Sequence, residues 1–319
     1  MSVALNDPAD TDYRQAHALL AAKGKTFYWA SHLLGERYAQ RATRLYRFCR
    51  YLDDLVDDAS SPDDAMAALD SVRAGILSGH STDTVVADAL RLINECGMDS
   101  QAVLELINGV ASDLGTVRLA DEAALLRYCY RVAGTVGIMM CAALEVRNEA
   151  ALPYAIDLGI AMQLTNICRD VAEDAGMGRR YLPASLVGDI SPGELRLPTP
   201  QTAARAEQAL ARLLNLAETY YASGMAGLPF LPLGARSGIV VAGQIYRQIG
   251  VQLKSAGYNY WKARAVVSAR AKAVVTARAL VAYGCKPSFW RVSAAHDANL
   301  HLALRGLPCV HSAERPSHG

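Results

Sequence analysis

Two acidic clusters, each within an otherwise apolar stretch, constrain this chain more than any other feature. The first runs from Asp53 to Asp58 and the second from Asn166 to Asp174. Each repeats polar side chains at intervals of four residues, which puts them on one face of a helix, about 6 Å apart along its axis. Like charges at this spacing repel each other, so the pattern indicates a bound cation. The sequence therefore predicts helices whose acidic faces hold a metal ion.

The candidate ligands are oxygen donors, which suit Mg²⁺, with Mn²⁺ as a substitute. A solvated helix face is the simpler interpretation of one such repeat. Two repeats, and Asn166 in step with Asp170 and Asp174, favour a diphosphate held between two helices by magnesium. The candidate metal ligands are Asp53, Asp54, Asp57, Asn166, Asp170 and Asp174.

Apolar residues make up 52% of the 319 residues, with only four Phe, and this composition favours helices. Helical periodicity recurs along the chain, and strand alternation with hairpin turns is absent. We expect one domain over residues 1–319, with flexible tails at 1–12 and 306–319. The proline-containing segment 183–200 predicts a long surface connection or lid. The expected helices are 13–22, 26–34, 36–59, 63–78, 83–96, 99–114, 121–147, 150–175, 201–223, 234–255, 257–283 and 287–305.

Charge, cysteines and motifs exclude several classes of protein. The net charge of +1 argues against a nucleic-acid partner. Seven scattered cysteines without a C-x-x-C are typical of reduced thiols in a cytosolic protein, and the histidines show no zinc spacing. The uncharged, mostly apolar run at residues 132–144 is shorter than the ~18 residues that span a bilayer. Dinucleotide, P-loop and serine-hydrolase motifs are missing.

Arginines and interior glycines suggest the rest of a site. Arg50 precedes Asp53 by three residues, and Arg169 lies inside the second cluster. Such donors stabilise the negative charge of a leaving diphosphate. Gly134 and Gly137 lie inside an apolar helical stretch, where they lower helix stability. Either close helix packing or an apolar channel for a hydrocarbon tail explains them, and both interpretations remain open here.

Four segments together resemble the squalene/phytoene synthases, the head-to-head isoprenoid synthases. These are residues 128–137, 166–183, 49–57 and 25–28, within a likeness that covers about residues 14–290. Thr26 replaces the serine usual in the N-terminal segment. The resemblance implies an all-α isoprenoid synthase fold, with helices around a central apolar cavity.

The resemblance also implies a reaction and roles for individual residues. One prenyl diphosphate ionises, the second attacks the allylic cation, and a cyclopropylcarbinyl diphosphate forms and then ionises in turn. The implied catalytic residues are Tyr128, Asp53, Asp57, Asp170 and Asp174. The implied diphosphate-binding residues are Arg50, Arg169, Arg179, Tyr258, Arg264 and Thr26. The implied prenyl pocket contains Phe27, Ser31, Val132, Ala133, Gly137 and Gln163.

Within the family, we expect magnesium-dependent condensation of two geranylgeranyl diphosphates through prephytoene diphosphate to phytoene, in carotenoid biosynthesis. The expectation rests on the lack of a C-terminal membrane anchor and of a nicotinamide motif, so NADPH is not expected. Ser31, one turn after Phe27, favours a longer tail. The alternatives are a C30 synthase that makes dehydrosqualene, squalene or presqualene diphosphate from farnesyl diphosphate, and a non-catalytic lipid-binding or assembly relative. Intact metal positions argue against the last.

We expect a cytoplasmic protein that contacts the membrane transiently to release a lipophilic product. Its oligomeric state stays open.

Overall fold

The computed structural model describes residues 8–292 and 295–310. Within this part of the chain the secondary structure is helical, apart from an isolated β-bridge between Arg118 and Arg180. The prediction of an all-α fold is confirmed. The α-helices are α1 (Pro8–Lys23), α2 (Lys25–Ser31), α3 (Glu36–Asp57), α4 (Pro62–Ser78), α5 (Thr84–Cys96), α6 (Ser100–Ala111), α7 (Glu122–Cys129), α8 (Thr135–Ala143), α9 (Leu152–Gly176), α10 (Ala184–Val187), α11 (Pro192–Arg196), α12 (Pro200–Ala226), α13 (Leu233–Ser255), α14 (Ala269–Gly284) and α15 (Pro287–Trp290). Four 3-10 segments are η1 (Ser112–Leu114), η3 (Glu149–Ala151), η4 (Leu228–Phe230) and η5 (Ala298–Leu304), and η2 (Tyr130–Gly134) is a π-helical turn.

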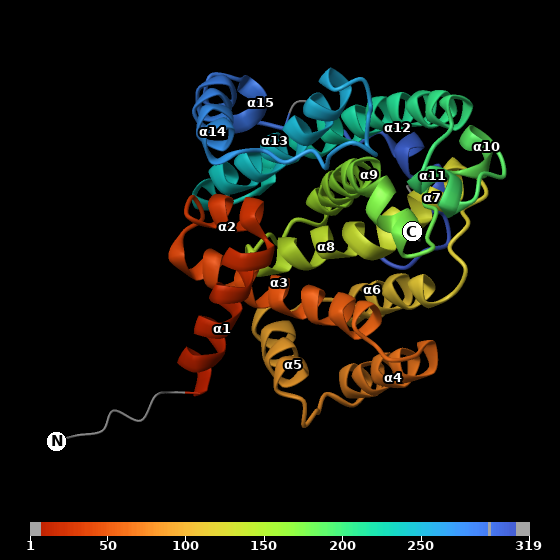
Figure 1. Cartoon of the computed structure of the whole chain (residues 1–319). Coiled ribbons are helices and arrows are strands. Elements are labelled where there is room, and N and C mark those ends of the chain that lie inside the picture. The colour runs from red at the N-terminus through yellow and green to blue at the C-terminus, as the bar shows by residue number, and fades with distance from the viewer. Residues whose placement is uncertain (1–7, 293–294, 311–319) are drawn as a thin grey trace, which may run out of the picture.

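Helix α9 lies at the centre of the molecule, with α12 and α13 above it and α8, α3 and α6 below it (Figure 1). It packs against α12, α8, α13, α11 and η2. Its buried side chains include Ile160, Leu164, Ile167 and Val171, spaced three or four residues apart. The second acidic cluster therefore belongs to a helix that neighbouring helices hold in place.

Helix starts follow the local chemistry of the sequence. The Ser61 side chain accepts a hydrogen bond from the Asp64 backbone N–H at 3.1 Å and caps α4, whose first residue is Pro62. The expected helix 63–78 therefore begins one residue earlier, at Pro62. Thr199 caps α12 in the same way, and Pro200 opens that helix.

Three predicted helices differ in the structure. The stretch 121–147 is divided by the π-helical turn η2 and ends at Ala143. Helix 257–283 begins only at Ala269, because Gly257 and Tyr258 have φ values of 63° and 55°, outside the helical region. Helix 287–305 is replaced by the short helices α15 and η5.

The connection 183–200 is packed, in contrast to the expected surface connection or lid. It contains α10 and α11, and its buried side chains include Val187, Ile190 and Leu195. A capping box formed by Ser191 and Glu194 starts α11, which lies against α9. The segment is therefore part of the wall around α9.

The C-terminal segment after α15 is fixed to the helices by polar contacts. Asp157, fully buried on α9, contacts the Nε2 atoms of His296 at 2.7 Å and His301 at 2.8 Å. Residues 306–310, placed in the expected tail, include the buried Leu307. Residues 8–12, placed in the other expected tail, begin helix α1. The remaining tail residues, 1–7 and 311–319, lie outside the described part. In the part that is described, no helix is long and apolar enough to span a bilayer.

Candidate active site

Helices α3 and α9 bring the two acidic clusters together. The Arg179 guanidinium, just after α9, donates to Asp57 Oδ1 on α3 at 3.0 Å. Asp113, from η1, lies close enough to raise the pKa of both Asp53 and Asp174. Carboxylates from three separate elements therefore converge on one region.

Two of these carboxylates have strongly raised pKa values. Asp53 has solvent-accessible surface, but many protein atoms lie around its carboxyl group. The resulting desolvation raises the pKa of Asp53 to about 7, although the positive charge of Arg50 acts to lower it. Desolvation, reinforced by the neighbouring charge of Asp170, raises the pKa of Asp174 to about 8. Both shifts come mainly from desolvation, and neighbouring carboxylates add to it.

Arginines neutralise the other carboxylates. Arg50 Nε donates to Asp54 Oδ1 at 2.8 Å, one turn along α3. Arg169 Nε and Arg264 Nε donate to Asp170 Oδ1 at 2.7 and 2.8 Å. Despite the desolvation of Asp170, these two arginines hold its pKa below the ordinary value. The predicted diphosphate-binding arginines thus already lie against the predicted metal ligands.

Asn166 carries an unsatisfied polar atom into this region. Its Oδ1 is buried and has no hydrogen-bond partner among the described residues, while its Nδ2 donates to Gln163 Oε1 at 3.3 Å. An orphan buried acceptor is destabilising unless a donor or a cation binds it. Together with carboxylates at 170 and 174 on the same helix face, this oxygen fits an oxygen-liganded divalent ion.

Tyr128 is held by Asp113. Its hydroxyl donates to Asp113 Oδ2 at 2.9 Å, and the Tyr181 hydroxyl donates to Asp113 Oδ1 at 2.7 Å. The two tyrosine rings lie 4.8 Å apart between centroids. Burial raises the pKa of Tyr128 well above its ordinary value, so its hydroxyl stays protonated.

An apolar cavity of about 300 Å³ extends from Asn166 between α2, α3, α8, α9 and α13. Its wall includes all six residues of the expected prenyl pocket: Phe27, Ser31, Val132, Ala133, Gly137 and Gln163. Three aromatic rings stand near its polar end, with the Phe27 centroid 6.0 Å from that of Tyr46 and 5.3 Å from that of Tyr246. Aromatic faces at this position can stabilise a cation.

The interior glycines serve close helix packing. A Cβ on Gly137 would lie 2.3 Å from the Ala155 carbonyl oxygen, and one on Gly159 would lie 2.3 Å from that of Ala133. Both glycines also line the cavity. Close approach of α8 and α9 is therefore required here, and the same small residues leave room beside the crossing.

Similarity to known proteins agrees with this geometry. Residues 20–271 match the squalene/phytoene synthase family. The chain belongs to that family.

Several family members are similar over most of their length. The phytoene synthase of Rhodobacter capsulatus is 35% identical over 79% of this chain and 76% of that protein. The phytoene synthase of Thermus thermophilus is 34% identical over 86% of this chain and 94% of that protein. Among solved structures, a dehydrosqualene synthase has a TM-score of 0.77 at 27% identity, covering 87% of this chain and 98% of that chain. A squalene synthase from Alicyclobacillus acidocaldarius shares the fold, with a TM-score of 0.68 at 20% identity over 79% of this chain and 96% of that chain.

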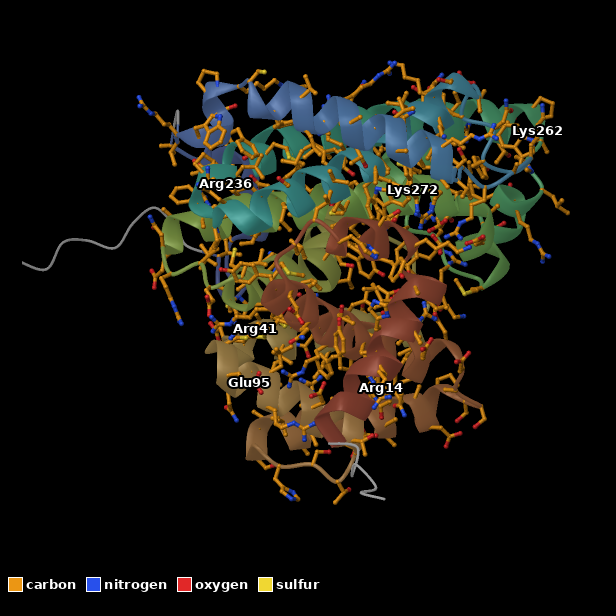
Figure 2. All side chains as sticks on the ribbon, turned by 90° about the vertical axis from the view of Figure 1, so that its left-hand side faces the viewer. Arg14, Arg41, Glu95, Arg236, Lys262 and Lys272 are labelled. Carbon is orange, nitrogen blue, oxygen red and sulfur yellow. The ribbon has the colours of Figure 1, made fainter. Side chains whose placement is uncertain are left out.

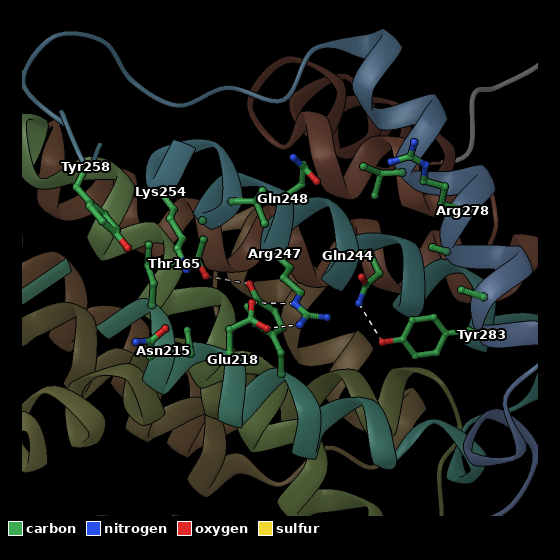
Figure 3. Close-up of a pocket in the computed structure, with 18 residues that line it drawn as sticks. Thr165, Asn215, Glu218, Gln244, Arg247, Gln248, Lys254, Tyr258, Arg278 and Tyr283 are labelled. Atoms are coloured by element: carbon green, nitrogen blue, oxygen red, sulfur yellow. Dashed lines mark hydrogen bonds and ion pairs between the residues drawn. The ribbon is translucent and has the colours of Figure 1, made fainter. Parts of the chain in front are cut away.

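Among the described residues, two of those expected to bind diphosphate, Tyr258 and Thr26, make no side-chain hydrogen bond to the acidic clusters. Tyr258 lines a second hollow of about 550 Å³ between α12, α13 and α14 (Figure 3). That hollow is larger than the cavity at Asn166, but its charged wall is partly neutralised by the ion pair of Arg247 with Glu218 (Nε to Oε1, 2.8 Å). Thr26 lies on α2 beside Phe27.

Sequence reasoning missed Asp113, Tyr181, Tyr46 and Tyr246. Asp113 lies in a short 3-10 segment and has no periodic partner, so nothing in the sequence marked it. Tyr46 could have been found, because it lies seven residues, or two turns, before Asp53 on the same helix face.

Proposed function

We propose that this protein is a phytoene synthase, which condenses two geranylgeranyl diphosphates head to head with Mg²⁺. One observation carries the proposal: carboxylates of α3 and α9 meet, with the orphan Asn166 Oδ1, near the polar end of an apolar cavity. This arrangement suits substrates with a diphosphate head and a long hydrocarbon tail. The phytoene synthases similar to this chain support the assignment.

The proposed metal ligands are Asp53, Asp54, Asp57, Asn166, Asp170 and Asp174. Bound Mg²⁺ would supply charge stabilisation to the leaving diphosphate. Charge on the carboxylates would then be neutralised by metal instead of arginine. Arg50, Arg179 and Arg264 would become free to donate to phosphate oxygens, in a site where such donors stabilise developing charge.

The apolar end of the site would bind the tails and protect the carbocations. Tyr46, Tyr246 and Phe27 offer aromatic faces to an allylic cation near the diphosphate. Tyr128 keeps its own proton and donates it to Asp113, which fixes the position of the hydroxyl oxygen. Tyr128 would therefore orient groups in the site and would not act as a general base. A dry, aromatic wall also excludes the water that would otherwise quench the cation.

A C30 synthase is the second candidate, because the dehydrosqualene synthase structure has the same fold at 27% identity. The two activities differ in tail length, which the cavity wall at Ser31 would help to set. We propose that NADPH is not used. We also propose a cytoplasmic enzyme that contacts the membrane peripherally to release its hydrocarbon product.

Incubation of the purified protein and Mg²⁺ with geranylgeranyl or farnesyl diphosphate, without NADPH, tests the proposal. A C40 hydrocarbon from the C20 substrate is expected by mass analysis. A C30 product from farnesyl diphosphate alone would assign the C30 activity instead. No turnover, with no effect of EDTA on substrate binding, would point to a non-catalytic relative.

A matched pair of variants tests the metal ligands. Asp57 and Asp58 are adjacent and both exposed at the end of α3. Asp57→Asn should lower kcat at least about 100-fold, and Asp58→Asn should leave it near that of the parent. Equal effects of the two substitutions would argue against the proposed ligand set.

A further inference from the structure

The charges of this chain are unevenly distributed. Residues 219–296 contain ten Lys and Arg and no Asp or Glu, although the whole chain is nearly neutral. These residues include α13, α14 and α15, and α14 lies along the top of the molecule in both views (Figures 1 and 2). Arg247 and Arg264 pair with carboxylates of α12 and α9, so the positive charge of this part of the molecule comes from the other eight side chains.

The outward face of α14 is apolar, which is unusual for an exposed helix. We define this α14 face by five exposed residues on one side of the helix: Ala273, Val274, Ala277, Leu280 and Val281. Val274 is 49% exposed and Val281 is 70% exposed. Arg270 and Arg278, both exposed, flank the face.

The short helix α15 extends the apolar surface beyond the end of α14. Trp290 is 53% exposed, and the nearby Val292 is 45% exposed. Lys286 and Arg291 are exposed beside them. Exposed tryptophan with flanking basic side chains is typical of segments that lie at a membrane–water interface.

We propose that the α14 face and Trp290 dock on an anionic lipid bilayer. Apolar side chains enter the boundary between headgroups and acyl chains, and the surrounding arginines and lysines contact lipid phosphates. A second copy of the chain fits less well, because its own α14 face would bring like charges together. Nucleic acid fits less well because the centre of the face offers no polar side chains to phosphates or bases.

The location of α14 connects this surface to the tail cavity. Trp29 Nε1 on α2 donates to Thr276 Oγ1 on α14 at 3.0 Å, and Lys272 Nζ donates to the Lys25 carbonyl oxygen at 3.0 Å. Helix α2 also carries Phe27 and Ser31, which line the cavity. Docking through α14 would place the cavity one helix away from the bilayer, which suits release of a hydrocarbon. This last step rests on the proposed function, whereas the docking itself does not.

Vesicle co-sedimentation without substrate tests the docking. The parent protein should bind equimolar phosphatidylcholine and phosphatidylglycerol at least about tenfold more tightly than phosphatidylcholine alone, and salt should weaken binding. Val274→Glu with Val281→Glu should reduce binding about tenfold or more. The matched control is Leu77→Glu, because Leu77 is 67% exposed on α4 at the opposite end of the molecule.

A charge variant separates the electrostatic contribution. Arg270→Gln with Arg278→Gln should weaken binding to the anionic vesicles by roughly fivefold per side chain. Activity on detergent-dispersed substrate should match that of the parent in all these variants, which shows that they fold.

Three results would overturn the docking proposal: no vesicle binding by the parent, equal loss in the Leu77 control, or binding to heparin without binding to vesicles. A protein that binds vesicles but makes no product would refute the proposed function and leave the docking surface intact.

Discussion

Asp174→Asn should stabilise the metal-free protein while it damages the site. The pKa of Asp174 is raised from 3.8 to about 8, so ionisation of this carboxyl opposes folding. At pH 7 the unfolded carboxyl is ionised and the folded one is not, which corresponds to about 4 kcal/mol, and solvent screening in an open site reduces this to about 1–2 kcal/mol. An asparagine removes the charge and retains the shape, so Tm in EDTA should rise by about 2–4 °C.

The pH dependence gives the sign of this effect. A raised folded-state pKa means that the protonated carboxyl favours folding, and that this advantage is lost as pH rises through about 8. The gain in Tm for Asp174→Asn should therefore be small at pH 5 and grow up to pH 9. Asp53, whose pKa is raised to about 7, keeps part of the pH dependence in the variant.

Differential scanning calorimetry in EDTA and in Mg²⁺ measures both consequences. The parent should gain stability from Mg²⁺, more at pH 8 than at pH 6, and the variant should gain much less. Glu207→Gln, at an exposed position on α12 away from the acidic clusters, is the control and should behave like the parent. A variant that is less stable than the parent in EDTA, or a gain that does not depend on pH, would refute the electrostatic reasoning.

Three other substitutions test separate parts of the site. Asp113→Asn should lower kcat about 10–100-fold with a small change in KM, because it weakens the hydrogen bonds that orient the hydroxyls of Tyr128 and Tyr181. Steady-state kinetics measures this effect, and an unchanged Tm would separate it from misfolding. Ser31→Phe should shift the preference from the C20 toward the C15 substrate in a competition assay, and an unchanged ratio would exclude this position as a determinant of chain length. Gly137→Ala should lower the free energy of unfolding by about 2–3 kcal/mol in urea titration, because its Cβ would meet the backbone of α9; a neutral result would show that α8 can move away.

The helices and the metal-binding pattern could be predicted because both depend on local spacing. The four-residue repeat at Asp170 and Asp174 requires only that the segment is helical, and burial of the apolar positions of α9 makes it so. Capping at Ser61 is equally local. Where the chemistry lies within one turn, the sequence is sufficient.

Features that depend on distant contacts were missed. Asp113 gains its role only because Tyr128 and Tyr181 reach it from two other segments. The late start of α14, at Ala269 instead of residue 257, follows a break at Gly257 and Tyr258, whose positive φ values apolar periodicity does not reveal. The π-helical turn η2 contacts α6 and α9, and sequence periodicity does not reveal these contacts.

The ratio of diphosphate released to hydrocarbon formed tests the central claim most directly. Head-to-head condensation through a cyclopropylcarbinyl diphosphate ionises both substrates, so two diphosphates should appear for each C40 hydrocarbon, and EDTA should abolish both products. Diphosphate release that yields only the C20 alcohol, or hydrocarbon formation that continues in EDTA, would contradict the account.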